Sequence, residues 1–142
     1  MKLTVCLGVL NEPSIYGNVM TEEHFTVIKE RIVKNGGIYG ESSIPALNNL
    51  STEEMYRRIK TVDMSKVSHC IKGVHMDGNK IMAAVETTGP HSHLLEMQTD
   101  GNTSFSISTN VQQPKFGIRG LKRHTENGED LIDIVSFDLV TP

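Results

Sequence analysis

Tryptophan is absent from this 142-residue chain, and aromatic residues make up only 5% of it. Basic residues are not in excess either, because 14 Lys and Arg stand against 17 Asp and Glu and the formal net charge is −3. Proteins that bind nucleic acid directly carry a basic surface, so direct nucleic-acid binding is not expected. No segment approaches the roughly 18 consecutive apolar residues of a membrane-spanning helix, so no membrane contact is expected.

Cysteine is also scarce. Cys6 and Cys70 are isolated, each lies in an apolar stretch, and neither belongs to a CxxC motif. This usage is typical of unpaired core cysteines in a reduced, intracellular protein. Among the six histidines, His91 and His93 are two residues apart, a spacing that points their rings in different directions on a helix, whereas helical zinc pairs are four apart. We therefore expect no metal ion and no other cofactor.

The first half of the chain contains a strand and two helices by its pattern. Its length suits one domain, expected to span 1–142. Residues 1–10 predict a strand, and Thr21-Glu22-Glu23 predicts the start of a helix that ends at Asn35-Gly36-Gly37. A capping box at Ser51-Thr52-Glu53-Glu54 predicts a second, shorter helix. The connection at 38–45 is expected to be irregular.

Strand patterns dominate the second half. Residues 67–76 and 80–87 flank a turn at Asp77-Gly78-Asn79, and residues 116–124 and 131–140 flank a polar cluster, so each pair predicts a hairpin. Residues 91–97 predict one or two helical turns. In all, six or seven mostly antiparallel strands and two or three flanking helices predict an α+β fold built on a curled sheet or small barrel.

One further predicted strand, residues 101–111, has an unusual polar face. Phe105, Ile107, Thr109 and Val111 alternate with Ser104, Ser106, Ser108 and Asn110. The row of small hydroxyls suits a half-exposed edge strand, and it equally suits a strand that presents a nucleophilic serine beside a cleft. On the hairpin before it, alternation puts His69, Ile71 and His75 opposite Cys70, Val74 and Met76, which predicts that His69 lies on the wetter face. There His69 is either a solvated side chain or a base for Ser106.

Motifs in the same order and at similar spacing occur in the phage prohead proteases, serine peptidases with an assemblin-like fold, and the chain resembles them. The matching segments are Asn11 to Tyr16, Gly40-Glu41-Ser42-Ser43-Ile44-Pro45, Val67-Ser68-His69, Gly78-Asn79, Ser104-Phe105-Ser106-Ile107-Ser108 and Val135 to Pro142. The resemblance implies that Ser106 occupies the position of the family's nucleophile. It also implies partners among phage capsid, scaffold or other virion proteins, and a place in the host cytoplasm during assembly or in the virion.

Two positions depart from the family pattern. The resemblance assigns a catalytic histidine to the position of Ile44, whose side chain has no proton-accepting atom. Ser108-Thr109 replaces an Arg-Gly or Gly that the resemblance associates with the oxyanion region. Active relatives also continue past their last strand into a tail that is removed, which a chain ending at Pro142 would lack.

Three functional hypotheses remain open from the sequence. In the first, the chain is a degenerate family member that acts as a structural or assembly component of a phage head. In the second, it is an active maturation protease with Ser106 as nucleophile and His69 as a substitute base. In the third, it is an unrelated small binding module. The sequence does not settle whether the chain forms a homo-oligomer.

Overall fold

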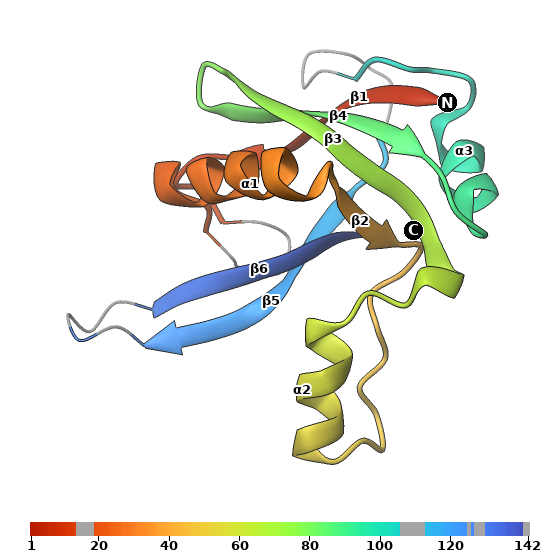
Figure 1. Cartoon of the computed structure of the whole chain (residues 1–142). Helices are drawn as coiled ribbons and strands as arrows, with labels where there is room; N and C mark the ends of the chain where they lie inside the picture. The colour runs from red at the N-terminus through yellow and green to blue at the C-terminus, as the bar shows by residue number, and fades with distance from the viewer. Residues whose placement is uncertain (14–18, 106–112, 125, 127–129, 141–142) are drawn as a thin grey trace.

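The computed structural model describes residues 1–13, 19–105, 113–124, 126 and 130–140 (Figure 1). Six strands, three α-helices and one short 3-10 turn occur in the described part. In chain order they are β1 (Lys2–Val9), α1 (Glu22–Asn35), β2 (Ile38–Glu41), α2 (Thr52–Lys60), η1 (Met64–Lys66), β3 (Val67–Asp77), β4 (Lys80–Thr87), α3 (Ser92–Thr99), β5 (Phe116–His124) and β6 (Asp130–Leu139).

The strands form two antiparallel sheets. One has four strands in the order β1-β4-β3-β2, and the other is the β5–β6 hairpin. Helix α1 lies between the larger sheet and the hairpin, while α2 projects below the body and α3 lies beside the N-terminus (Figure 1). The predicted α+β fold is therefore confirmed, with a curled arrangement of two sheets in place of a closed barrel.

The hydrophobic core fills the space between the larger sheet, α1 and the hairpin. Its completely buried members include side chains from α1, β3, β4, α3 and β6, namely Ile28, Ile71, Ile81, Leu95 and Phe137. Helix α2, by contrast, buries no residue. Since apolar packing supplies most helical stability in a folded protein, α2 needs polar contacts to hold its position against the body.

Several local signals in the sequence correctly predicted structure. Helix α1 begins after Thr21 and ends at Gly36, whose φ of 78° is the left-handed conformation that favours glycine. The Ser51 side chain accepts a hydrogen bond from the Glu54 N–H at 3.2 Å and so caps α2. Both hairpins and the short α3 helix also form where they were predicted.

Two expectations about the region around β2 and β3 were wrong. Residues 38–41 form strand β2, paired with β3, because Gly37 after the α1 cap turns the chain back alongside the sheet. His69 does not lie on a wet face, since every residue from Val67 to Ile71 is buried. The start of β3 is covered on both faces, and a register shift between Ile71 and Gly73 breaks the simple alternation that the prediction assumed.

The predicted serine strand lies only partly within the described residues. Its first residues run parallel to β1, where the Thr4 N–H donates to Thr103 O at 2.8 Å and the Phe105 N–H donates to Thr4 O at 2.9 Å. Phe105 is buried in the core. Ser106 and the residues up to 112 lie outside the described part of the chain.

Candidate active site at the junction of the two sheets

Strands β2 and β6 approach each other very closely at Gly40. A Cβ atom on this residue would lie 2.1 Å from Phe137 O and 2.2 Å from His69 Nε2, distances that real Cβ atoms do not reach. The absence of a side chain therefore lets the hairpin cross the end of the larger sheet. The first residue of the motif at 40–45 is a glycine for this packing reason.

His69 joins the two sheets at the same point. Its Nε2 lies 2.7 Å from Phe137 O and its Nδ1 lies 2.7 Å from Ser68 Oγ. Since a carbonyl can only accept, Nε2 carries the proton and Nδ1 accepts from the Ser68 hydroxyl in the neutral ring. The side chain has no exposed surface, and burial lowers its pKa to about 4 although the bond to Phe137 opposes that shift. Both ring nitrogens are thus engaged in a buried, neutral link.

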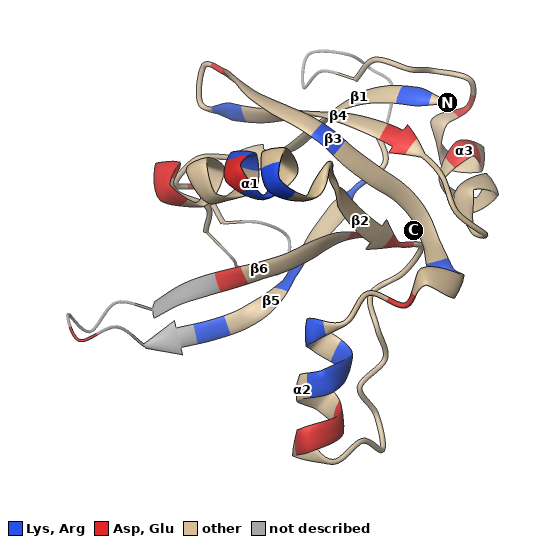
Figure 2. Ribbon diagram, in the orientation of Figure 1, with Lys and Arg blue, Asp and Glu red and all other residues tan. Residues whose placement is uncertain are grey.

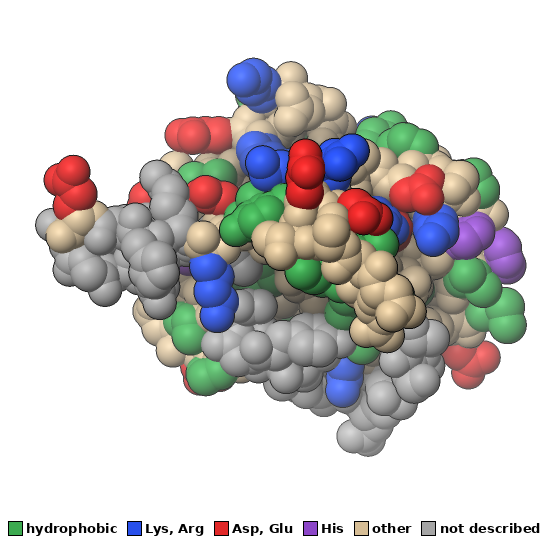
Figure 3. Space-filling model, turned by 90° about the horizontal axis from the view of Figure 1, so that it is seen from below, with side chains coloured by type: hydrophobic (Ala, Val, Ile, Leu, Met, Phe, Trp, Pro, Cys, Tyr) green, Lys and Arg blue, Asp and Glu red, His purple; other side chains and the backbone are tan. Residues whose placement is uncertain are grey.

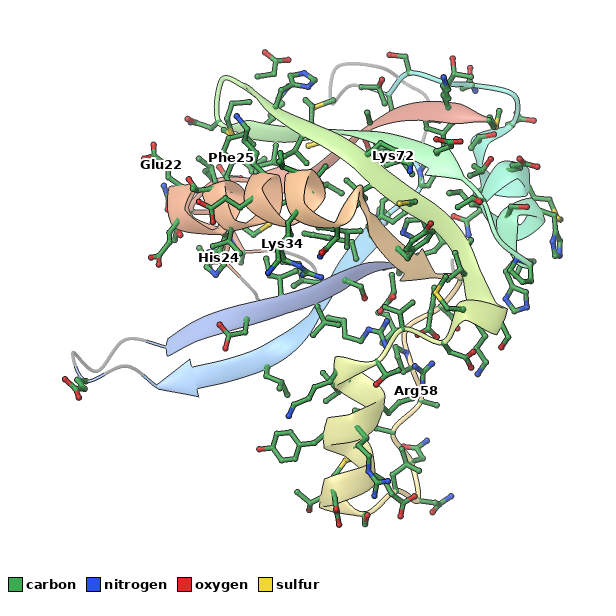
Figure 4. The ribbon with its side chains drawn as sticks, viewed as in Figure 1. Glu22, His24, Phe25, Lys34, Arg58 and Lys72 are labelled. Carbon is green, nitrogen blue, oxygen red and sulfur yellow. The ribbon has the colours of Figure 1, made fainter. Side chains whose placement is uncertain are left out.

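Glu41, the second motif residue, holds helix α2 against the body. Its carboxylate is buried and accepts from both terminal nitrogens of Arg58, with Arg58 Nη1 2.8 Å from Oε2. The Asp63 N–H donates to the same oxygen at 3.0 Å. Arg58, labelled in Figure 4, leaves α2 to make this two-pronged contact. The Glu41 carboxylate therefore helps to anchor a helix that has no buried residues.

A second arginine and a second carboxylate extend this network across β5 and β6. Arg119 Nη2 lies 3.0 Å from Glu41 Oε2, and Arg119 Nε lies 3.0 Å from Asp138 Oδ2. Arg119 Nη1 also donates to the carbonyls of Arg58 and Thr61 at the end of α2. Asp138 accepts from the Glu41 N–H at 3.0 Å, so side chains connect β2 to β6 where no backbone ladder does.

The two buried carboxylates respond to this environment in opposite directions. Burial pushes the pKa of Glu41 upward, but the Arg58 hydrogen bond, the Asp63 N–H and the charge of Arg119 outweigh it and the pKa is lowered. At Asp138 burial prevails over the Glu41 N–H and Arg119, and the pKa is raised. The four charged side chains balance two positive against two negative charges and form a structural junction.

Ile44 lies three residues after Glu41 in a different setting. Its side chain is 42% exposed and lines a small hollow of about 170 Å³ together with Pro45, Leu47, Ile59 and residues 118–120. The wall is mainly aliphatic, and its one charged member, Arg119, is already engaged with Asp138 and Glu41. The hollow can hold an apolar group but offers no proton acceptor at Ile44.

Ser42 and His91 form a hydrogen-bonded pair near this hollow that the sequence did not predict. Ser42 Oγ lies 2.7 Å from His91 Nδ1, and the His91 N–H donates to Val67 O at 2.9 Å. No described side chain hydrogen-bonds the other ring nitrogen of His91; the nearby His93 ring stands 6.2 Å away, centre to centre. Among the described residues the pair has no third group of the kind that orients the base in a catalytic triad, and it anchors the motif loop to the bend before α3.

The described residues therefore place only part of the predicted site. His69 is buried at the junction, Ile44 is exposed at the hollow, and Ser106 lies outside the described residues, so pairing of Ser106 with His69 stays a prediction. Among the residues that the structure describes, no cluster of three His, Cys, Asp or Glu side chains could hold a metal ion. No helix in the described part is long and apolar enough to span a membrane. Cys6 and Cys70 are both buried and free.

Sequence reasoning missed the partners of Glu41. Arg58, Arg119 and Asp138 come from a helix and two strands distant in the chain, and no local pattern links them to the motif. One signal was available: Arg119 and Asp138 are charged residues within otherwise strand-like segments. Charges buried in this way require partners of opposite sign.

Comparison with known proteins decides the relationship of this chain. The model of the peptidase S80 family matches residues 3–142. The chain belongs to the peptidase S80 family. Among solved structures it is similar to the bacteriophage T4 capsid assembly protease, gp21, with a TM-score of 0.61 and 12% identity over 99% of this chain and 81% of that chain. No match is found among curated protein sequences.

These findings confirm the resemblance to the phage prohead proteases and the protease-like fold. Membership in the S80 family also excludes the hypothesis of an unrelated binding module. At 12% identity the structural likeness shows the fold and leaves activity open.

Proposed function

We propose that this S80 family member is an assembly or structural component of a phage head whose protease site is degenerate. In this proposal it binds capsid, scaffold or other virion proteins in the host cytoplasm during assembly and does not cleave them. One observation carries the proposal: the position assigned to the catalytic histidine is Ile44, an exposed aliphatic side chain at an apolar hollow.

The chemistry of acyl transfer explains why this position matters. A serine hydroxyl needs a nearby base to remove its proton, and such assistance typically contributes about 10²–10⁴-fold in rate. Ile44 cannot provide it. His69 is a poor replacement, because its two ring nitrogens are engaged by Ser68 and Phe137 and a swing toward another group would break both buried hydrogen bonds.

An active protease remains the second candidate because the chain belongs to a peptidase family. In that reading Ser106 is the nucleophile and His69 is the base. It requires the buried His69 ring to exchange one of its present partners for the Ser106 hydroxyl.

Covalent labelling separates the two candidates. The purified protein is treated with a fluorophosphonate probe beside its Ser106→Ala variant, and is separately incubated with the scaffold and major capsid proteins of its own phage. We expect equal, background labelling of both proteins, no cleavage, and co-purification with a head protein. Labelling that maps to Ser106 and disappears in Ser106→Ala would establish the active protease instead.

A further inference from the structure

Strand β5 has one edge paired with β6 and a second edge that has no backbone partner among the described residues. The Val140 N–H donates to Lys115 O at 2.8 Å, which makes 115 and 140 a hydrogen-bonded pair of the antiparallel ladder. Such pairs alternate with non-bonded ones, so the backbone groups of Phe116, Ile118, Gly120 and Lys122 point away from β6. The extra residue at the bulge belongs to β6, which leaves this alternation along β5 intact. No backbone hydrogen bond joins this edge to another described residue.

Side chains occupy part of the far edge of β6. The Arg31 guanidinium donates to the carbonyls of Ile134 and Val135, and His69 donates to Phe137 O. These contacts occupy acceptors that an added strand would need. The outer backbone groups of β5 from Phe116 to Lys122 thus have no described partner, whereas three outer carbonyls of β6 are occupied.

The hollow at Ile44 lies against the stretch of β5 whose outer edge has no described backbone partner, because three consecutive residues of this strand, 118–120, line it. Ile44 and Ile59 form part of the facing wall. Its volume of about 170 Å³ is below the usual range for drug-sized ligands and suits a side chain of an extended peptide.

Two lysines lie close in the chain to residues of the hollow. Lys60 follows Ile59 and Lys122 lies two residues after Gly120, so each is close in the chain to a residue of the hollow. No described acidic side chain forms an ion pair with either lysine. Basic residues occupy the last turn of α2 and lie along β5 (Figure 2), and the view from below shows basic, acidic and hydrophobic side chains next to one another (Figure 3).

We propose that an extended, acidic segment of a partner protein adds as a strand to the edge of β5 from Phe116 to Lys122 and places an aliphatic side chain in the hollow. Backbone hydrogen bonds supply affinity, while the hollow and the lysines select the sequence. That the partner is a head protein rests on the proposed function; the strand-addition site itself does not. A second copy of β5 is disfavoured because it would bring two basic strands together.

A synthetic peptide tests the site directly. The probe is a blocked seven-residue peptide with glutamates at alternate positions, valines between them and leucine at the centre. We expect calorimetry to show 1:1 binding and amide exchange to slow at Ile118 and Gly120. Gly117 and Arg119 serve as internal controls, because their amides already face β6 and should change little. Peptides with lysine in place of glutamate, or with alternate amides methylated, should bind at least about tenfold more weakly.

Matched variants test the hollow and the charge. Ile44→Asp puts a carboxylate at the hollow, and Val33→Asp makes the same change on α1 at a side chain that is 85% exposed. Lys122→Glu reverses a charge at the edge, and Lys34→Glu does so on α1. We expect Ile44→Asp to weaken peptide binding about tenfold and Lys122→Glu several-fold, with both α1 variants unchanged.

Three outcomes would overturn the proposal: no peptide binding, binding that leaves the exchange of Ile118 and Gly120 unaltered, or self-association through β5 that the peptide blocks. None of these concerns catalysis. If the peptide did not bind and Ser106 were not labelled, the strand-addition proposal would be wrong and the proposal of a degenerate protease would stand. Labelling of Ser106 would exclude the degenerate protease, and the strand-addition site would then stand or fall on peptide binding alone.

Discussion

The two ends of the motif at 40–45 lie in opposite environments. Gly40 and Glu41 are buried where the two sheets meet. The Glu41 carboxylate contacts Arg58 of α2, the Asp63 N–H and Arg119 of β5, and so links three parts of the chain. Ile44 is 42% exposed and touches an apolar hollow. The first end is required by the fold, whereas the second is open to change without loss of structure.

If the site is degenerate, as we propose, this contrast explains how the fold can persist without a histidine at position 44. Replacement of an exposed side chain usually changes stability little, whereas removal of one partner of a buried ion pair costs several kcal/mol. Selection for a folded protein therefore preserves Gly40-Glu41 even if cleavage is no longer needed. Only selection for cleavage would preserve a histidine at the position of Ile44.

The largest effect is expected from Glu41→Gln. The change removes the charge that balances Arg58 and Arg119 at a buried site, and should lower the free energy of unfolding by about 3–5 kcal/mol. Urea denaturation measures it. Glu53→Gln is the matched control, because Glu53 pairs with Arg57 on the exposed face of α2 and its loss should cost less than about 0.5 kcal/mol. Equal effects of the two variants would show that the junction does not stabilise the fold.

Gly40→Ala should have the second-largest effect on the free energy of unfolding. The added methyl group would collide with Phe137 O and His69 Nε2, both of which are held in the junction, so we expect a loss of about 2–3 kcal/mol. In the control Gly73→Ala, also in a strand, the nearest atom to the new methyl group is Ala84 Cβ at 4.0 Å. That variant should unfold at the same denaturant concentration as the parent or slightly above it. A tolerated Gly40→Ala would mean that β6 can move away from β2.

The junction should also give the protein a specific pH dependence. The pKa of His69 is about 4 in the folded state and near 6.5 in the unfolded chain, so the unfolded state binds the extra proton first as pH falls. The stability that His69 confers is therefore complete above about pH 6.5 and is lost progressively down to about pH 4. Between pH 7 and pH 5 we expect a loss of about 2 kcal/mol, measured by urea denaturation at each pH.

The variant His69→Gln isolates this contribution. Asp138 and Glu41 titrate in the parent and the variant alike, so the difference between the two slopes reports His69 alone. We expect the variant to be less stable at pH 7 but to lose less stability on acidification. Identical slopes would mean that His69 is not shielded from water and would reopen its use as a base.

Local rules predicted the helices and hairpins because their signals lie within a few residues. Ser51 caps α2 through an N–H three residues away, and Gly78 closes a hairpin between adjacent strands. Strand β2 was missed because it has four residues and its pairing depends on the distant β3. Three of its four residues, Ile38, Gly40 and Glu41, are buried through contacts with distant elements, chiefly β3 and β6, which a local pattern cannot supply.

The site was predictable only as far as the motif reached. At the position where the resemblance assigns a histidine, the lack of a proton acceptor at Ile44 could be recognised from the sequence, since it follows from the type of side chain. The state of His69 could not, because its buried partners are a neighbouring hydroxyl and a carbonyl 68 residues away. Alternation placed its ring on a wet face, and the crossing hairpin covered that face.

The smallest effect on stability is expected from Ile44→His, which restores the residue type that the family resemblance assigns to this position. The side chain is 42% exposed and makes no buried polar contact, so the free energy of unfolding should change by less than about 0.5 kcal/mol. Denaturation beside Glu41→Gln, three residues earlier, gives the sharpest form of the contrast. If Ile44→His destabilised the protein as much as Glu41→Gln, both ends of the motif would be structural. The isoleucine would then be a packing requirement of this chain, and it would no longer support the proposal of a degenerate site.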